Sequence, residues 1–212
     1  MRLRGRVVPA LRTLLASLPI VAGGLAALHA ATDGFQAFTS ETARRLSIAR
    51  DPRLLPQVPL EAADGSTVQL GDLRGRWLLV DFIYTRCETY CSVQGNEFAR
   101  LQQRLGTQIQ AGQVQLVSIS FDPAYDDPAQ LAAYQRRSGD RGSGWIVARP
   151  VQTTDLPKLL ATFGVKAVPD GLDGYVHNAA ISIVNPEGRV VAVLDWDAMQ
   201  QAQDYVLQRV AP

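Results

Sequence analysis

The sequence is poor in several residue types, and each shortage narrows the possible functions. Among 212 residues there are two cysteines, Cys87 and Cys91, together with two histidines and two lysines. Two cysteines are too few for a disulfide scaffold or a four-cysteine zinc ribbon. The formal net charge is +1, so the chain lacks the strong positive field that is typical of nucleic-acid-binding proteins. No repeat or low-complexity tract is present, and the composition is that of an ordinary globular protein.

Long apolar runs are also scarce, and the one that qualifies lies at the N-terminus. The first 12 residues carry four arginines and no acid, and residues 13–31 contain no Asp, Glu, Lys or Arg. A basic start before such a run is typical of a signal peptide or a membrane anchor. We favour an uncleaved anchor because the run is long for a signal peptide, although Pro19, Gly23 and Gly24 weaken it as a helix. The arginines would then stay in the cytoplasm.

This interpretation divides the chain into three parts and predicts that everything after residue 31 is exported from the cytoplasm. Residues 1–31 form the basic end and anchor (or signal peptide), residues 32–58 a linker rich in proline, and residues 59–212 the folded domain. Within the linker, a short helix is expected at Thr39–Ala43, with Ser40 as its cap.

Export leaves 17 basic against 20 acidic residues, because four of the 21 basic residues are lost with the anchor. The exported part carries a charge of −3, and its two thiols lie in an oxidising compartment, where a nearby pair tends to close. We therefore expect a single-pass protein of the cytoplasmic (inner) membrane with its soluble domain on the periplasmic side.

The pattern of apolar residues predicts an α/β domain. Strands are expected at 76–85, 114–121 and 144–149, helices at 92–105, 127–137, 153–164 and 197–210, and hairpins at 59–70 and 175–195. Asp127 and Pro128 are typical of a helix start, and Gly164 of a helix end. Strands that alternate with helices and end in a hairpin plus helix indicate a mixed sheet covered on both faces. The order matches a thioredoxin-like fold with an added N-terminal β-hairpin.

The two cysteines lie where that fold places reactive groups. Cys87 follows the first core strand, and Cys91 lies at the first turn of the next helix. Unpaired amides and the helix dipole at such a terminus favour thiolate. The spacing of four puts both sulfurs on one side of the turn, close enough for redox chemistry or for sharing a soft metal. The alternative is a structural disulfide, which would contribute only about 2 kcal/mol for so small a loop.

A metal site needs further ligands, and few candidates exist. His177 is the one histidine outside the leader, and it precedes a strand whose preceding loop packs against the redox turn in thioredoxin-like folds. Two thiolates and one imidazole suit copper as Cu(I) and Cu(II), whereas structural zinc would need a fourth ligand. Asp122 and Asp126 lie at the same end of the sheet and are candidates for a direct or supporting role. Their alternatives are turn formation for Asp122 and helix capping for Asp126 or Asp127.

Four segments together resemble one family. They are "DFIYTRCETYCS", "SISFDPAYDDP", "WIVAR" and "YVHNAAISIVNPEGRV", and over residues 60–194 the chain is similar to the Sco/SenC family. The resemblance implies a membrane-anchored, thioredoxin-like protein that binds copper and serves cytochrome c oxidase assembly. It also implies Cys87, Cys91 and His177 as copper ligands. Asp122 and Asp126 would be the family's acidic pair.

The chain departs from the family at two positions. Ser92 replaces the usual proline after the second cysteine, and Val176 replaces the usual aspartate before the histidine. Loss of an acid beside a metal-binding histidine can weaken its orientation or basicity, because such neighbours tune ligands. Copper affinity and the choice of partner are the properties that these departures put in question.

The sequence therefore supports several hypotheses. The first is a metallochaperone that delivers copper to the copper-binding subunit of cytochrome c oxidase, or exchanges it with another copper chaperone, without contact with nucleic acid. The second is an enzyme, a thiol–disulfide oxidoreductase in which Cys87 attacks and Cys91 resolves the mixed disulfide. A thiol peroxidase is a weaker variant of the second. The third is a tethered binding domain with an inert disulfide.

Overall fold

The computed structural model describes residues 4–87, 90–140 and 142–210, with only the backbone described for residues 4–11 and 90–92. The chain forms two compact units, Met1–Leu46 and Ser47–Pro212. The predicted linker 32–58 is divided between them. Its later residues Ile48, Leu55 and Val58 are buried in the core of the second unit.

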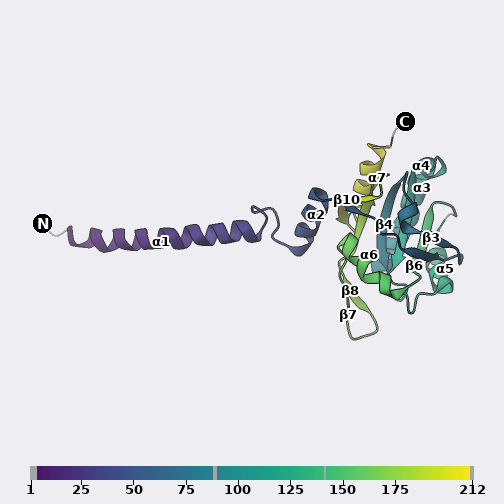
Figure 1. Cartoon of the computed structure of the whole chain (residues 1–212), viewed down its shortest axis with the longest axis horizontal. Helices are drawn as coiled ribbons and strands as arrows, with labels where there is room; N and C mark the ends of the chain where they lie inside the picture. The colour runs from purple at the N-terminus through teal and green to yellow at the C-terminus, as the bar shows by residue number, and fades with distance from the viewer. Residues whose placement is uncertain (1–3, 88–89, 141, 211–212) are drawn as a thin grey trace. The chain divides into compact units, whose positions relative to one another are not determined.

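The first unit is dominated by helix α1 (Arg4–Ala31), drawn in purple in Figure 1. Its segment Arg12–Ala31 has a mean hydropathy of 1.8 over 20 residues and is not buried by the protein, so it is long and apolar enough to cross a membrane. Pro19 and the two glycines do not interrupt the helix. Helix α2 (Ser40–Arg50) then begins one residue after Thr39, whose hydroxyl accepts a hydrogen bond from the amide of Thr42 at 3.1 Å. The predicted cap was therefore wrong by one residue, because Thr39 and not Ser40 satisfies the first turn.

The second unit is built on an eight-stranded mixed sheet (Figure 1). The strand order is β1-β10-β9-β4-β5-β6-β2-β3, with β4, β5 and β6 parallel and the other neighbours antiparallel. The strands of this sheet are β1 (Arg53–Leu54), β2 (Pro59–Ala62), β3 (Thr67–Gln69), β4 (Trp77–Ile83), β5 (Val114–Ser120), β6 (Trp145–Pro150), β9 (Ala180–Val184) and β10 (Arg189–Asp195).

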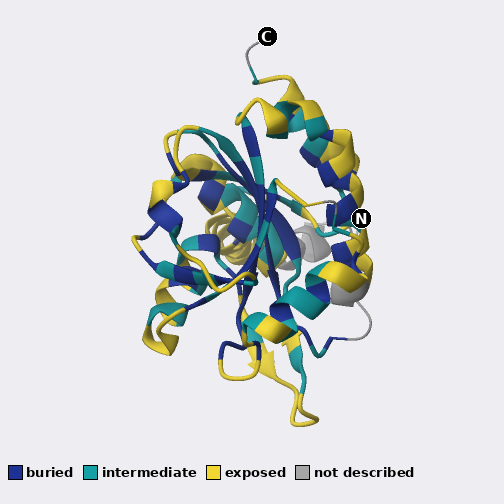
Figure 2. Cartoon of the chain, turned by 90° about the vertical axis from the view of Figure 1, so that its right-hand side faces the viewer, coloured by how far each residue is buried: buried dark blue, intermediate teal, exposed yellow. Residues whose placement is uncertain are grey.

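Helices cover both faces of this sheet, as Figure 2 shows by the buried strands between them. The helices are α3 (Tyr90–Arg104), α4 (Gly106–Gln110), α5 (Pro128–Arg137), α6 (Leu156–Phe163) and α7 (Met199–Leu207), with short 3-10 turns at Leu70–Asp72 and Thr153–Asp155. Phe98 of α3 and Tyr134 of α5 both contact Trp145, with ring centroids 6.1 and 6.3 Å away. Phe163 of α6 packs on Phe82 at 5.1 Å, on the other face of β4. The predicted α/β class and its mixed sheet are confirmed, including the β2–β3 hairpin.

Local signals in the sequence explain two helix ends. The Asp127 side chain accepts a hydrogen bond from the amide of Gln130 at 2.8 Å, with Pro128 at the first helical position. Gly164 ends α6 with a φ of 64°, in the left-handed region where glycine is favoured. Both predictions are confirmed.

One predicted hairpin is confirmed in part. Strands β9 and β10 form it around the turn at Asn185–Gly188, but it begins at Ala180. Tyr175–His177, which the prediction included, forms β8 and pairs with β7 (Ala167–Pro169) instead. Asn178 fixes this break: its side chain accepts from the amide of Lys166 at 2.6 Å and donates to the carbonyl of Gly164 at 3.2 Å. The result is a separate β7–β8 hairpin that carries His177.

Candidate functional site

Cys87 lies in a tight turn just after β4, at the carboxyl end of the central parallel strands. Its amide donates to the carbonyl of Tyr84 at 3.3 Å, and the residue is 7% exposed. Cys91 has its backbone in the first turn of α3, but its side chain lies outside the described residues. The structure thus places Cys91 at the helix start that the sequence indicated, and leaves its predicted pairing with Cys87 untested.

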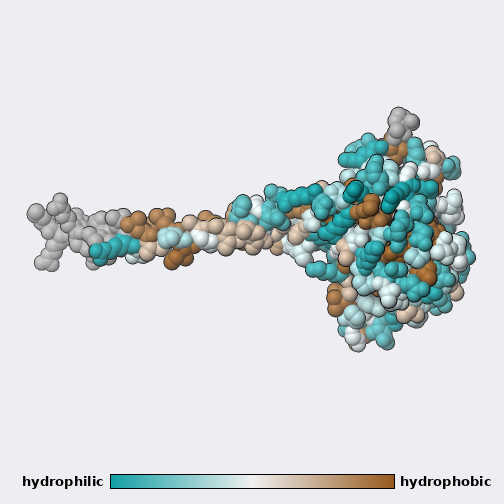
Figure 3. Space-filling view, in the orientation of Figure 1, coloured by the Kyte–Doolittle hydropathy of each residue, from teal (hydrophilic) through white to brown (hydrophobic). Residues whose placement is uncertain are grey.

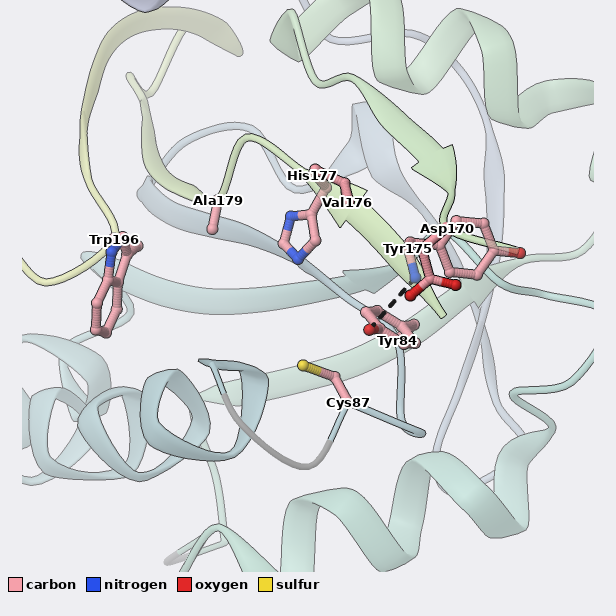
Figure 4. Close-up of a pocket in the computed structure, with 8 residues that line it drawn as sticks. All are labelled: Tyr84, Cys87, Asp170, Tyr175, Val176, His177, Ala179 and Trp196. Atoms are coloured by element: carbon pink, nitrogen blue, oxygen red, sulfur yellow. Dashed lines mark hydrogen bonds between the residues drawn. The ribbon is translucent and has the colours of Figure 1, made fainter. Parts of the chain in front are cut away.

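His177 approaches Cys87 from the β7–β8 hairpin. In Figure 4 the sulfur of Cys87 and the imidazole of His177 face the same hollow from opposite walls. This cavity has a volume of about 490 Å³ and is lined by Tyr84, Cys87, Asp170, Tyr175, Val176, His177, Ala179 and Trp196. Burial lowers the pKa of His177, while the negative charge of a Cys87 thiolate would act to raise it. The imidazole is therefore held in the neutral form that can bind a metal.

Aromatic rings limit the orientation of the histidine. The His177 ring lies 5.0 Å from the ring of Phe121 and 6.2 Å from that of Tyr84. Tyr175 packs edge-on against both, at 5.2 and 5.3 Å, and its amide donates to the Tyr84 hydroxyl at 3.5 Å (Figure 4). The sequence reasoning missed these three residues. Tyr84 and Phe121 directly follow parallel strands, at the edge where α/β proteins place their sites, and that position could have pointed to them.

Asp126 holds the turn that carries Cys87 through hydrogen bonds to Thr85. Its buried carboxylate accepts from the amide and hydroxyl of Thr85 at 3.1 and 2.5 Å and from the hydroxyl of Ser120 at 2.5 Å. Burial raises the pKa of Asp126, and these hydrogen bonds oppose the rise. The alternative that Asp126 caps α5 is wrong, because Asp127 does so.

Asp122 contacts both segments that carry candidate ligands. One carboxylate oxygen forms an ion pair with Arg86 at 2.6 Å, and the other accepts from the hydroxyl of Tyr175 at 3.3 Å. Burial, and then the charge of Asp122, raise the pKa of Tyr175, so its phenol keeps the proton that it donates. Arg86 precedes Cys87, and Tyr175 lies two residues before His177. A single carboxylate therefore joins the cysteine turn to the histidine hairpin.

The structure also reveals a buried acid that the sequence reasoning did not single out. Asp81 on β4 is completely buried, and burial raises its pKa to about 7. Its neighbour in the sheet register is Ser118 of β5, whose hydroxyl accepts from the indole of Trp145 at 2.9 Å. Asp81 therefore lies on the face of the sheet that Trp145 and α3 cover, away from the face that carries Phe82.

The side chain of one predicted copper ligand, Cys91, lies outside the described residues. Among the described side chains, no three of the His, Cys, Asp and Glu type cluster closely enough to hold a metal. Cys87 and His177 share the cavity, and Cys91 would be the third ligand. Asp122 and Asp126 do not line the cavity.

Comparison with known proteins identifies the family of this chain. The sequence model of SCO1/SenC matches residues 50–211, which is nearly all of the second unit. This chain belongs to the SCO1/SenC family. Among curated relatives, a putative copper-binding protein of Stutzerimonas stutzeri is 28% identical over 94% of this chain and 98% of its own length. A SCO1 protein homolog of Bacillus subtilis is 30% identical over 60% of this chain and 66%, just under two thirds, of its own length.

Solved structures of this family share the fold. ScoI of Bradyrhizobium japonicum with copper bound has a TM-score of 0.61 at 23% identity, over 74% of this chain and 99% of its own. BsSco, a member of the Sco family of cytochrome c oxidase assembly proteins in which a disulfide switch was identified, has a TM-score of 0.65 at 23% identity, over 74% of this chain and 94% of its own. The thioredoxin-like fold expected from the sequence is therefore confirmed.

Proposed function

We propose that this protein is a membrane-tethered copper metallochaperone, which takes up copper through Cys87, Cys91 and His177 and delivers it to cytochrome c oxidase during assembly. The observation that carries the proposal is the cavity that Cys87 and His177 share although 90 positions separate them in the sequence. The copper-binding relative and the copper-bound ScoI structure support the choice of metal.

The donor set suits copper as a cargo. Thiolate sulfur favours Cu(I), and an added imidazole nitrogen accommodates Cu(II). The neutral state of His177 leaves a ring nitrogen available to bind the ion. His177 and Trp196 in the walls of this cavity are only half-buried, so the site is partly exposed to solvent. Reversible transfer requires such access.

Asp122 and Asp126 would act by positioning the ligands. Asp126 fixes Thr85 and Asp122 fixes Arg86, the two residues before Cys87. Through Tyr175, Asp122 also reaches the hairpin of His177. The residue immediately before His177 is Val176 and not an acid, and the surrounding aromatic rings would hold the imidazole in place instead.

The membrane tether would be helix α1. Its length and apolar composition suit a single span, and its arginine-rich start would remain in the cytoplasm. The copper site would then work on the periplasmic side of the inner membrane. The recipient would be the copper-binding subunit of the oxidase, or another copper chaperone would exchange copper with this protein there.

An anaerobic Cu(I) titration of the reduced protein against a competing chromophore tests this proposal. We expect one Cu(I) per chain, a loss of binding in Cys87→Ser and weaker binding in His177→Ala. The matched control is His29→Ala, which removes the other histidine, on α1. A Cys87→Ser variant with the wild-type affinity would contradict the ligand assignment.

A second candidate function is thiol–disulfide exchange with a partner protein. It is favoured by the position of Cys87 in a turn that leads into a helix start, and by the disulfide switch of BsSco. The Cys87 thiolate would attack a partner disulfide, and Cys91 would then displace the partner as a free thiol. This chain would be left with a Cys87–Cys91 disulfide. His177→Ala should damage copper binding while leaving this exchange largely intact.

A further inference from the structure

The β7–β8 hairpin carries an exposed apolar surface beside the candidate copper site. Val168 and Val176 are directly opposite each other in the register and are 60% and 69% exposed. Leu172, at the tip, is 86% exposed. We call these three side chains the hairpin surface, and Figure 3 shows apolar side chains where Figure 1 places β8. Large apolar side chains that gather at the surface are typical of a protein interaction site.

The fold does not need this surface to be apolar. Because side chains alternate along a strand, Tyr175 and His177 lie on the opposite face of β8 from Val176. Tyr175 packs on Tyr84 and Phe121, which holds the hairpin to the domain. The valine pair is turned away from these contacts. Its apolar character therefore calls for an explanation outside the packing of the described residues.

The position of the hairpin surface relates it to the copper site. Val176 adjoins His177 and lines the same cavity as Cys87. Bonds between a metal and its protein ligands are about 2 Å long. A partner that takes copper from Cys87 and His177 must bring its own ligand atoms into this cavity, and it then lies beside the β7–β8 hairpin.

The charges at the hairpin tip indicate the chemistry of that partner. Asp170 and Asp173 are exposed and flank Leu172. The Asp170 carboxylate accepts from the amides of Leu172 and Gly174 at 2.7 and 3.0 Å, which fixes the loop. Asp173 and Arg86 line a second, smaller cavity together with Tyr175. An apolar residue between two acids complements an apolar loop with lysine or arginine beside it.

We propose that the hairpin surface is where the protein that exchanges copper with this chain docks. The partner presents a projecting apolar loop that carries thiolate, thioether or imidazole ligands and has basic side chains beside it. This inference rests on the proposed function, because it assumes that copper occupies the cavity.

The transfer is a ligand exchange without a change of oxidation state. A partner thiol loses its proton as its sulfur binds Cu(I), and the bond from copper to the sulfur of Cys87 breaks. Cys87 then takes up a proton, so charge and atoms balance. Docking on the hairpin raises the rate of this step by holding the two sets of ligands together.

The test compares copper transfer to a protein with copper transfer to a small chelator. The full chain in detergent, loaded with Cu(I), is mixed with the copper-free soluble domain of the oxidase copper-binding subunit, or with bicinchoninate. The test variant is Val168→Ser/Leu172→Ser, which leaves Val176 beside His177 unchanged. The matched control is Leu54→Ser/Val151→Ser, which removes two exposed apolar side chains outside the hairpin.

We expect the hairpin variant to transfer copper to the subunit at least fivefold more slowly, with the wild-type rate to bicinchoninate. Asp173→Asn, which removes one charge, should slow transfer about twofold at low salt and less at high salt. The control should match the wild type in both reactions. Circular dichroism and the Cu(I) affinity of each variant show that the fold and the site are intact.

Other results would overturn the inference in recognisable ways. A hairpin variant that binds copper normally and transfers it at the wild-type rate refutes the docking surface and leaves the proposed function standing. A wild-type protein that binds no Cu(I) refutes the proposed function itself. A wild-type protein that binds copper but passes none to the subunit refutes both delivery and this surface. Sedimentation that shows a wild-type dimer and a monomeric hairpin variant would assign the surface to a second copy of the chain.

Discussion

Replacing Asp81 by asparagine should make the protein more stable at pH 8 and reduce the dependence of its stability on pH. The carboxyl is fully buried, and its pKa rises from 3.8 to about 7 in the folded protein. The folded state binds this proton more tightly than the unfolded state does. Below pH 3.8 the carboxyl is protonated in both states, so its ionisation costs no stability there. Stability is lost as the pH rises from 3.8 to 7 and stays lost above that.

The size of the effect follows from the two pKa values. One pKa unit corresponds to about 1.4 kcal/mol, so the full loss is about 4 kcal/mol at pH 8, of which about 1.6 kcal/mol is already lost at pH 5. Between these two pH values the wild type should lose about 2 to 3 kcal/mol more free energy of unfolding than Asp81→Asn. Asp126, whose pKa is raised, and His177, whose pKa is lowered, contribute slopes of opposite sign, and both contributions cancel when the two proteins are compared.

Urea unfolding at pH 5 and pH 8, followed by circular dichroism, measures this difference. Asp64→Asn is the matched control, because Asp64 lies in the exposed β2–β3 turn and its pKa is lowered, mainly by a hydrogen bond from Ser66. That carboxyl is ionised throughout this range, so the control should keep the wild-type slope. Equal slopes in wild type and Asp81→Asn would refute the conclusion that burial holds the proton on Asp81.

Three further predictions concern the site and its support. Asp122→Asn should weaken copper binding about tenfold without unfolding the protein, because it loosens the contacts to Arg86 and Tyr175. An unchanged copper affinity in the chromophore titration would contradict the positioning role of Asp122. Tyr175→Phe removes only the hydrogen bond to Asp122, so it should weaken copper binding less than Asp122→Asn does. A greater loss of copper affinity in Tyr175→Phe than in Asp122→Asn would be inconsistent with this arrangement. Asp127→Ala removes the cap of α5 and should lower the free energy of unfolding by about 1 kcal/mol with no change in copper affinity, which urea unfolding and titration together can check.

The sequence predicted the elements whose signals are local. The β2–β3 turn at Asp64–Gly65, the start of α5 at Asp127 and the end of α6 at Gly164 each depend on residues within one turn, and each was predicted at the right place. The β7–β8 hairpin was missed because its strands have three residues each, too few for a period to show. Its formation depends on the side chain of Asn178, which acts over 12 and 14 positions in the sequence.

The site could be predicted in its chemistry but not in its contacts. Cys87 and His177 were chosen for their rarity and their place in the topology, and the structure brings both to one cavity. The roles of Asp122 and Asp126 depend on hydrogen bonds to residues 36 to 53 positions away, which no local pattern encodes. Phe121 belongs to the site through ring contacts that only the folded chain creates.

X-ray absorption at the copper edge of the Cu(I)-loaded, reduced protein tests the central claim most directly. The account predicts two sulfur ligands at about 2.2 to 2.3 Å and one nitrogen at about 2.0 Å, as expected for thiolate and imidazole. The nitrogen should be lost in His177→Ala and retained in His29→Ala. A wild-type spectrum without a nitrogen ligand, or one that His177→Ala leaves unchanged, would contradict the assignment of Cys87, Cys91 and His177 as a single copper site.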